Sequence, residues 1–296
     1  TMRARRWTAA AGALVLTAAL AACGDDDGET TTEPEVQEEA SFEEGTTMAE
    51  LNEAGAITIG TKFDQPLFGL RGPSGDPEGF DVEIGKIIAG ELGIEPDGVE
   101  WVETVSANRE PFIEDGRVDI VVATYTINDT RKETVSFAGP YYVAGQSILV
   151  LADNEDIQGP DDLAGKTVCS VEGSTPAENM RTNYPEAELS LTDAYSNCLE
   201  PLRNGQVDAL TTDNVILSGF VAQNEGEFEL RGDLFTEEPY GIGLERCDTD
   251  FRNFINDTLE AAFEDGRWEE AWEATAGAVL ETPEPPEVDR YEAEGC

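Results

Sequence analysis

The chain has 296 residues, of which 63 are acidic, 18 are basic and none is histidine, so its formal net charge is −45. A negative charge of this size disfavours nucleic acids and anionic membrane surfaces as partners. The absence of histidine excludes a Ser-His-Asp triad and any histidine-based metal site. The sequence therefore predicts neither a resident metal nor a cofactor.

The first 47 residues are typical of an export signal followed by a tether. Three arginines precede an apolar run over 8–20, which reaches roughly 20 Å and is too short for a hydrocarbon core of ~30 Å. This layout predicts a signal peptide over 1–22. The run ends in Leu-Ala-Ala-Cys, which resembles a bacterial lipobox and implies lipidation of Cys23, the alternative being an ordinary thiol. Residues 23–47 are rich in Asp, Glu and Thr and predict a disordered acidic tether, because they cannot bury enough apolar surface.

Strand-like and helix-like segments alternate through the rest of the chain. Ile84, Ile87 and Ile88, for example, share one face of a helix expected over 81–92. Such alternation predicts an α/β fold with mostly parallel sheets that helices cover on both faces. In chain order we expect strands at 56–61, 118–123, 147–151, 166–171 and 207–210, and helices at 81–92, 176–183, 195–203, 215–222, 251–264 and 268–275.

One sequence pattern occurs twice. Gly116-Arg-Val-Asp119 precedes one apolar strand, and Gly205-Gln-Val-Asp208 precedes another. In each case we expect a helix to end at the glycine and a strand to follow at once, since glycine favours the left-handed conformation of a helix C-terminus. The repeat indicates either two similar α/β domains or the chance recurrence of a common loop.

Polar residues that follow the predicted strands are the candidates for a binding site, because ligands of open α/β sheets lie beyond the carboxyl ends of the strands. Arg131 stands out. With Asn128 as N-cap it is the third residue of a helix, where a cation opposes the helix dipole by roughly 0.3–1 kcal/mol. This position favours a neighbouring anion, unless Arg131 is simply exposed. The candidates are Lys62, Gln65, Thr124, Thr126, Arg131, Ser174, Thr175 and Asp213.

Several candidates also have a structural interpretation. Thr175 as N-cap, with Pro176 and Glu178 behind it, forms a capping box that needs no ligand. Asp213 could cap the helix that follows it, and Lys62 could be a solvated lysine. In the functional interpretation, Arg131 and Asp213 supply opposite charges to a zwitterion from two domains, so that binding draws the domains together.

A series of motifs between about Ala56 and Ala276 follows the order of a known family. They are GFDVEI at 79–84, ATYTI at 123–127 with Arg131, VSF at 135–137, PYY at 140–142, GKTV at 165–168, GST at 173–175, VDA at 207–209 and YGIG at 240–243. In these motifs the chain resembles the family 3 solute-binding proteins of ABC importers for polar amino acids. TKFDQP at 61–66 and CSVEGSTP at 169–176 are similar to segments of actinobacterial glutamate-binding lipoproteins.

The resemblance implies a hinged, two-lobed fold of the type II periplasmic-binding-protein kind, with a mostly parallel, doubly wound sheet in each lobe. Two strand crossovers, near Ala144 and Pro239, would form the hinge. The implied domains are lobe 1 at 48–144 and 240–280, lobe 2 at 145–239 and a C-terminal tail at 281–296.

Four cysteines remain after Cys23, and by number alone they allow three disulfide pairings. Export makes disulfides permissible. With the lobes that the resemblance implies, Cys169–Cys198 falls within lobe 2 and Cys247–Cys296 ties the tail to lobe 1. We favour this pairing, in which neither bridge locks the hinge.

The resemblance also assigns a role to each candidate. The implied roles are α-carboxylate binding by Arg131 and Thr126 with Ser174 and Thr175, α-ammonium binding by Asp213 and the Thr124 carbonyl, and side-chain recognition by Lys62 and Gln65, with Arg109 in reserve. A cation at Lys62 favours glutamate as the ligand. The aromatic residue that often packs on the ligand near Ser106 is missing.

The sequence thus predicts a monomeric, lipid-anchored extracytoplasmic subunit that captures glutamate, or else glutamine, aspartate or asparagine, for an ABC permease. One alternative is a sensor subunit that acts on a separate signalling partner. A dehydratase of the cyclohexadienyl type is the other, but the chain has no histidine base and no evident carboxylate couple. We therefore expect a binding protein and not an enzyme.

Overall fold

The structure is a computed structural model and describes residues 35–37, 40–73, 75–292 and 296. The predicted signal peptide, the lipidation site Cys23 and much of the tether lie outside the described residues. The chain divides into two compact units, Thr1–Thr31 and Thr32–Cys296, and the description below concerns the second. No helix in the described part of the chain is long and apolar enough to cross a membrane.

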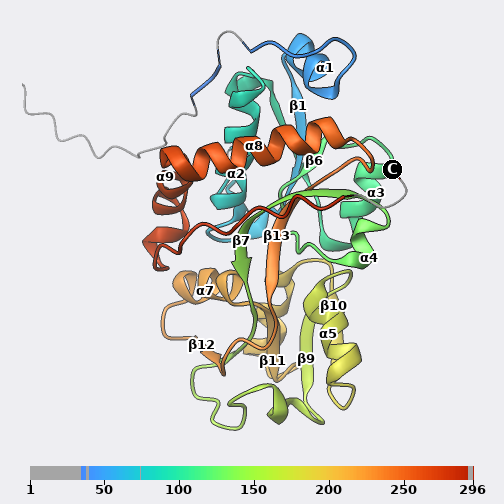
Figure 1. Ribbon diagram of the computed structural model, residues 1–296. Helices are drawn as coiled ribbons and strands as arrows, with labels where there is room; N and C mark the ends of the chain where they lie inside the picture. Colours follow the sequence, from blue (N-terminus) through green and yellow to red (C-terminus); the bar gives the residue numbers. More distant parts are fainter. Residues whose placement is uncertain (1–34, 38–39, 74, 293–295) are drawn as a thin grey trace, which may run out of the picture. The chain divides into compact units, whose positions relative to one another are not determined.

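The first of two five-stranded sheets defines lobe 1 (Figure 1). Its order is β5-β1-β6-β13-β7, in which β5, β1 and β6 are parallel and β13 is antiparallel to both its neighbours. The strands are β5 (Val99–Glu103), β1 (Ile57–Thr61), β6 (Ile120–Val121), β13 (Glu238–Leu244) and β7 (Ser136–Ala144). The helices of this lobe are α1 (Thr47–Ala54), α2 (Phe80–Glu91), α3 (Arg109–Glu114), α4 (Asp129–Lys132), α8 (Thr249–Asp265) and α9 (Arg267–Ala274).

The second five-stranded sheet defines lobe 2 and repeats the pattern. Its order is β10-β9-β11-β8-β12, with β10, β9 and β11 parallel and β8 antiparallel to both its neighbours. The strands are β10 (Glu188–Thr192), β9 (Thr167–Val171), β11 (Ala209–Asp213), β8 (Gln146–Leu151) and β12 (Phe228–Arg231). Its helices are α5 (Thr175–Asn183), the short 3-10 turn η4 (Tyr195–Cys198), α6 (Leu199–Arg203) and α7 (Asn214–Gln223).

The chain crosses between the lobes along β7 and β13, which run side by side in Figure 1. β7 ends at Ala144 and β8 begins at Gln146, while β13 returns with Glu238 opposite Ala144. The fold is thus the expected two-lobed α/β type. As expected, each sheet is mostly parallel: four of its five strands share one direction, and the reversed strand is β13 in lobe 1 and β8 in lobe 2. Each reversed strand is the one with which the chain enters that lobe from the other.

Local predictions differ from the structure at a few places. The apolar run 118–123 gives a strand only at β6, and the expected helix at 195–203 divides into η4 and α6. A small antiparallel sheet was not predicted, because its strands of two or three residues show no periodicity. It consists of β2 (Asp64–Gln65), β3 (Gly69–Arg71) and β4 (Pro77–Glu78).

The repeated sequence pattern forms the same corner in both lobes. Gly116 and Gly205 have φ angles of 62° and 64°, the left-handed region that glycine adopts without strain. The Asp119 side chain then accepts a hydrogen bond from the Thr58 amide at 2.7 Å, one residue before β1 and β6 begin to pair at Ile59 and Ile120. Asp208 accepts one from the Thr167 amide at the same distance. Each corner therefore fixes where a helix ends and where the central strand begins.

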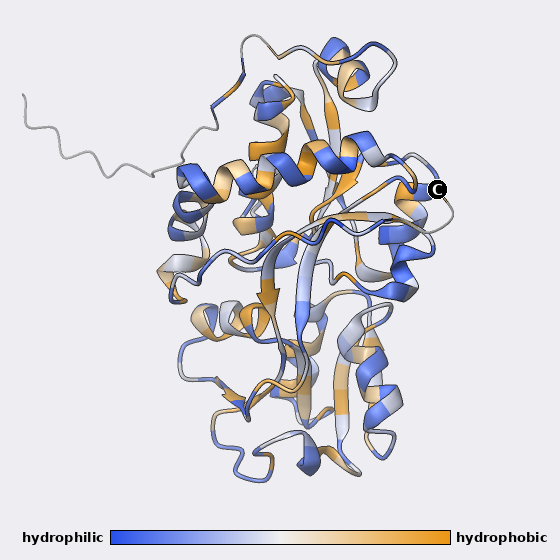
Figure 2. Ribbon diagram, viewed as in Figure 1, coloured by the Kyte–Doolittle hydropathy of each residue, from blue (hydrophilic) through white to orange (hydrophobic). Residues whose placement is uncertain are grey.

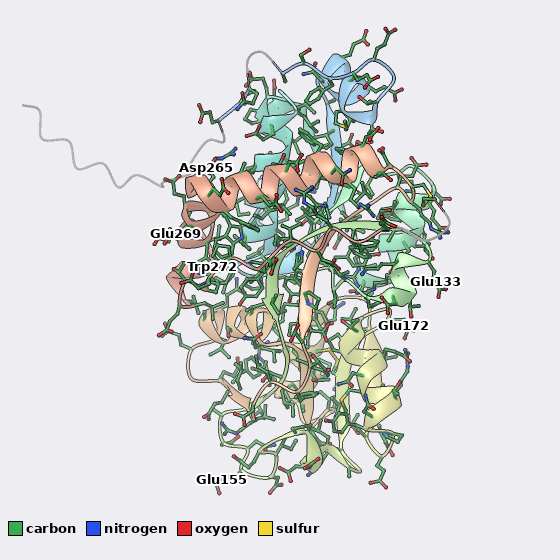
Figure 3. The ribbon with its side chains drawn as sticks, in the orientation of Figure 1. Glu133, Glu155, Glu172, Asp265, Glu269 and Trp272 are labelled. Carbon is green, nitrogen blue, oxygen red and sulfur yellow. A yellow bond between two sulfur atoms is a disulfide. The ribbon has the colours of Figure 1, made fainter. Side chains whose placement is uncertain are left out.

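The helices pack through regularly spaced apolar residues. In α8, Phe251, Ile255, Leu259 and Ala262 are buried, and Figure 2 shows hydrophilic and hydrophobic positions alternating along this helix. Acidic residues lie on the outside, as Figure 3 shows for its labelled side chains. Those exposed are Glu133, Glu155, Glu172, Asp265 and Glu269, whereas Trp272 is buried.

Both favoured disulfides are present. Cys169–Cys198, with an S–S distance of 2.03 Å, joins β9 to η4, and Cys247–Cys296 joins the segment before α8 to the end of the chain. Each bridge closes a loop of a few tens of residues, for which the loop-entropy model gives a stabilisation of about 3–4 kcal/mol.

Candidate ligand-binding site

A small cleft of about 200 Å³ lies between the lobes. Four of the eight predicted site residues, Thr124, Ser174, Thr175 and Asp213, line it. A larger hollow, about 590 Å³, lies among 160–164 and 183–187 of lobe 2 and contains none of the candidates. The complete lining of the small cleft is Ser106, Arg109, Thr124, Ser174, Thr175, Pro176, Tyr195, Asp213 and Ile216.

Arg131 is buried and not a surface residue, since only 7% of its surface is exposed. The Asn128 side chain accepts a hydrogen bond from the Arg131 amide at 2.9 Å, which is the predicted N-cap of α4. The guanidinium donates to the carbonyl oxygens of Thr126 at 2.6 Å and Gly173 at 3.1 Å, and its Nε lies 3.3 Å from a Glu110 oxygen. Burial lowers the pKa of Arg131 to about 10, so the group stays cationic at neutral pH.

Arg109, held in reserve at first, lines the cleft directly. It begins α3 and is buried, and it donates to the carbonyls of Ser106 and Thr124. Its Nη2 lies 3.4 Å from the Gly173 oxygen, the same atom that Arg131 approaches. Two cations of lobe 1 therefore converge on one carbonyl of lobe 2.

Lys62 is 3% exposed, so the solvated-lysine interpretation is wrong. Its Nζ donates to Ser106 Oγ at 2.9 Å, which places it behind the cleft lining. Burial, and next the charge of Arg109, lowers the pKa of Lys62 to about 7. Gln65 Oε1 accepts from Thr124 Oγ1 at 3.0 Å, while its buried Nε2 has no hydrogen-bond partner among the described residues.

Asp213 ends β11 and stands at the N-cap position of α7, but the capping interpretation is wrong. None of the hydrogen bonds of the described residues joins its carboxylate to an α7 amide. One oxygen accepts from the Tyr240 hydroxyl at 2.6 Å, and the other is buried without a partner among the described residues. Burial, and next the charge of Glu238, raises the pKa of Asp213 to about 8. An unpaired buried oxygen of this kind is an acceptor that a ligand can satisfy.

The start of α5 corrects the predicted capping box. Ser174, not Thr175, is the N-cap: its hydroxyl accepts from the Ala177 amide at 3.2 Å. Thr175 is the first helical residue, so its hydroxyl is free to reach lobe 1. Its Oγ1 lies 2.7 Å from Glu238 Oε2 and 3.2 Å from Thr126 Oγ1.

Asp81, the acidic residue of the GFDVEI motif, was not among the predicted site residues. It is fully buried, and its carboxylate accepts from the Tyr141 hydroxyl at 2.6 Å and from the Thr124 amide at 2.8 Å. Thr124 has a φ angle of 43°, which a β-branched residue adopts only when its surroundings impose it. Asp81 thus holds Thr124 in place. The signal in the sequence was an acidic residue among the apolar residues that begin a helix.

The site therefore combines buried cations with a buried acceptor across one cleft. Lys62, Arg109 and Arg131 belong to lobe 1, whereas Asp213 belongs to lobe 2. Groups of opposite charge on the two sides of one cleft suit a small zwitterion. No group of three or more acidic or cysteine side chains among the described residues is placed to hold a metal ion.

Comparison with known families agrees with this chemistry. Residues 57–274 match the model of the bacterial extracellular solute-binding proteins, family 3. The chain belongs to this family. The matched range includes both five-stranded sheets and every residue of the cleft lining.

Two similar proteins have names that refer to amino acids. The chain is 42% identical over 275 residues to the glutamate-binding protein GluB of Corynebacterium efficiens, a match that covers 89% of this chain and 88% of that protein. It is 37% identical over 257 residues to the ABC transporter glutamine-binding protein GlnH of Bacillus subtilis, covering 86% and 90%.

A solved structure has the same fold. The crystal structure of the solute receptor for L-cysteine of Neisseria gonorrhoeae matches with a TM-score of 0.75 at 32% identity. The match covers 79% of this chain and 95% of that one. The two-lobed α/β architecture is therefore that of the amino-acid receptors.

Proposed function

We propose that this protein captures L-glutamate between its lobes and delivers it to the permease of an ABC importer. The observation that carries the proposal is the pair of lobe 1 guanidiniums, those of Arg109 and Arg131, which meet at the Gly173 carbonyl of lobe 2. Their charges act on Asp213, which has an unpaired buried oxygen in the same lobe as Gly173. The names of the glutamate- and glutamine-binding relatives support the same ligand class.

The α-carboxylate would bind where the Gly173 carbonyl now meets the two guanidiniums. A carboxylate is the better acceptor for a guanidinium, because both partners are charged and two parallel hydrogen bonds can form. Arg131 would supply the fork, and the hydroxyls of Thr126, Ser174 and Thr175 would complete the anion site.

The α-ammonium would bind to Asp213. Its unpaired oxygen and the Thr124 carbonyl offer two acceptors from opposite lobes. A bound cation would also return Asp213 to the ionised state that burial now opposes. The carboxylate of the zwitterion would therefore pair with the cations of lobe 1, and its ammonium with Asp213 of lobe 2.

The side-chain carboxylate of glutamate would lie toward Lys62, Ser106 and Gln65. Lys62 would supply the cation and Gln65 Nε2 a neutral donor, so that glutamate is favoured and glutamine remains acceptable. Arg109 is the second cation within reach of this end of the cleft.

Closure would occur by bending at the crossovers of β7 and β13, with domain boundaries near Ala144 and Pro239. We also propose that residues 1–22 direct export, that Cys23 carries the lipid anchor and that residues 23–47 tether a monomeric receptor to the outer face of the membrane. The acidic tether would keep the receptor mobile above the permease.

We propose binding and not catalysis, because the buried carboxylates of the site already serve structural hydrogen bonds. Asp81 holds Thr124, and Asp213 accepts from Tyr240. Glu238, whose charge acts on Asp213, likewise accepts hydrogen bonds from the hydroxyls of Thr175 and Thr236, so this pair of acids is not free to act as a proton-transfer couple.

Calorimetry of the purified protein with glutamate, glutamine, aspartate and asparagine tests this function. We expect glutamate to bind with the highest affinity and glutamine more weakly. If none of the four binds, the proposed ligand class is wrong, although the family assignment stands.

A further inference from the structure

The last residues of the chain lie beyond the range that matches family 3, which ends at residue 274. We call residues 281–296 the C-terminal strap, of which 293–295 are outside the described residues. The strap crosses lobe 1 in front of β7 in Figure 1, and the Cys247–Cys296 disulfide fixes its end. Its role cannot be carried over from the family motifs.

The strap pairs with the free edge of the lobe 1 sheet. β7 is an edge strand, and the Asp289 amide donates to the Gly139 carbonyl at 2.8 Å. The Tyr291 hydroxyl accepts a hydrogen bond from the Phe137 amide, also at 2.8 Å. These contacts satisfy β7 groups that would otherwise face solvent.

Tyr291 also holds the helix that carries Arg131. Lys132, the last residue of α4, places its Nζ 4.2 Å from the centre of the Tyr291 ring and 3.7 Å from an Asp289 oxygen. The guanidinium of Arg252 in α8 lies 4.6 Å from the same ring. Tyr291 is thus a shared contact of α4 and α8.

A chain of aromatic contacts continues from Tyr291 to the cleft. Tyr291 packs on an apolar cluster that contains Phe137 and Tyr125, and the rings of these two are 4.7 Å apart. Tyr125 also contacts the guanidiniums of Arg109 at 4.2 Å and Arg131 at 5.0 Å. The Tyr291 ring therefore supports the packed rings of Phe137 and Tyr125, which we call the Tyr125 layer. The guanidiniums of Arg109 and Arg131 rest on this layer.

The residue next to Tyr291 in the strap, Arg290, offers a contrast. Arg290 forms ion pairs with Asp257 and Glu260 of α8, all on the exposed surface. Exposed pairs of this kind contribute little to stability. Among the described residues, the ion pairs and hydrogen bonds of the Arg290 side chain go to α8 and not to α4 or Tyr125. Arg290 is thus a matched control for Tyr291.

We propose that Tyr291 is a positioning residue for the ligand α-carboxylate. Anchored by Cys247–Cys296, the strap holds α4 and the Tyr125 layer so that Arg131 faces the cleft. This inference rests on the proposed function, in which Arg131 binds that carboxylate.

Affinity measurements on Tyr291→Ala, Tyr291→Phe and Arg290→Ala, well below their melting temperatures, test the inference. Tyr291→Ala should weaken glutamate and glutamine binding by the same factor, about tenfold, since both ligands share the α-carboxylate. Tyr291→Phe keeps the ring and should restore most of the affinity, and Arg290→Ala should bind as the wild type does.

A double-mutant cycle separates positioning from stability. In an Arg131→Lys background, which loses the guanidinium on Tyr125, Tyr291→Ala should have little further effect on affinity. Full additivity of the two changes, or a lower melting temperature with unchanged affinity, would overturn the proposal.

Hydrogen exchange without ligand keeps this test independent of the proposed function. Peptides covering 125–135 should exchange faster in Tyr291→Ala than in Arg290→Ala, whatever the protein binds. Equal exchange in the two variants would contradict the positioning role. If the wild type binds no amino acid but the two variants still differ in exchange, only the proposed ligand is refuted and the positioning role stands.

Discussion

Arg131 shows how far a single residue could be predicted. A cation in the first turn of a helix is unfavourable unless an anion lies near, so the sequence alone makes Arg131 a site candidate. Lys62 was harder to interpret, because a lysine after a strand is most often solvated. Only the packing of Ser106 and Arg109 around it shows that it is buried.

Two other residue-scale interpretations failed for physical reasons. Ser174 and Thr175 are adjacent hydroxyl residues, either of which can cap a helix, and the backbone angles that decide between them are not evident in sequence. Asp81 was missed because its partners, Thr124 and Tyr141, are distant in the chain.

Replacing Arg131 by Ala should abolish most glutamate binding. Loss of one partner of a buried charge pair costs about 2–5 kcal/mol, because the ligand carboxylate is left desolvated and unpaired. Calorimetry measures the change. Arg181→Ala, which removes an exposed arginine of lobe 2 with ion pairs to Glu172 and Glu178, is the matched control and should leave affinity unchanged. A loss below about 1 kcal/mol for Arg131→Ala would show that the carboxylate binds elsewhere.

The preference for glutamate over glutamine should decline as pH rises. Lys62 has a pKa lowered to about 7 by burial, with Arg109, Asp64, Arg131 and Asp81 as the charges around it. A ligand carboxylate favours the protonated lysine, so glutamate binding takes up a proton above pH 7. Glutamate affinity should then fall by up to about tenfold per pH unit, whereas the contributions common to both ligands cancel in the ratio.

The measurement is the dissociation constant of glutamine divided by that of glutamate, determined from pH 6 to 9. In Lys62→Met this ratio should be smaller than in the wild type and independent of pH. A wild-type ratio that stays constant across this range would remove Lys62 from side-chain recognition.

At the scale of elements, the long segments were predictable and the short ones were not. The 3.6-residue spacing of apolar residues indicates the helices α2 and α8. The repeated corners at Gly116 and Gly205 indicate where a helix ends and a strand follows. The two-residue strands β2, β4 and β6 are too short to show a period. The register of β6, in addition, is set by β1, which is distant in the chain. The crossover strands likewise take their direction from the connection between lobes.

Gly219 in α7 should limit closure if it is given a side chain. A Cβ at this position would lie 2.6 Å from the Pro66 carbonyl of lobe 1 and 3.0 Å from its Cβ. Gly219→Ala should therefore weaken glutamate binding several-fold, while in the open state it favours the helix by up to about 1 kcal/mol.

Affinity and the melting temperature without ligand measure these two effects, and Ser218→Ala on the same helix is the control. An unchanged affinity for Gly219→Ala would mean that the lobes do not approach this closely when ligand binds.

At the scale of the whole molecule, the acidic surface opposes an anionic ligand. The net charge of −45 repels glutamate, and the cations of the cleft act only at short range. The association rate of glutamate should therefore increase with ionic strength, whereas that of uncharged glutamine should change little. Stopped-flow measurements from low to physiological salt test this, and equal salt dependence for both ligands would show that the surface charge has no influence on capture.

A crystal structure with glutamate bound tests the central claim most directly. The account predicts the α-carboxylate on Arg131, the α-ammonium on the free oxygen of Asp213 and the side-chain carboxylate toward Lys62. Glutamate in the reverse orientation, or bound outside the cleft between the lobes, would contradict it.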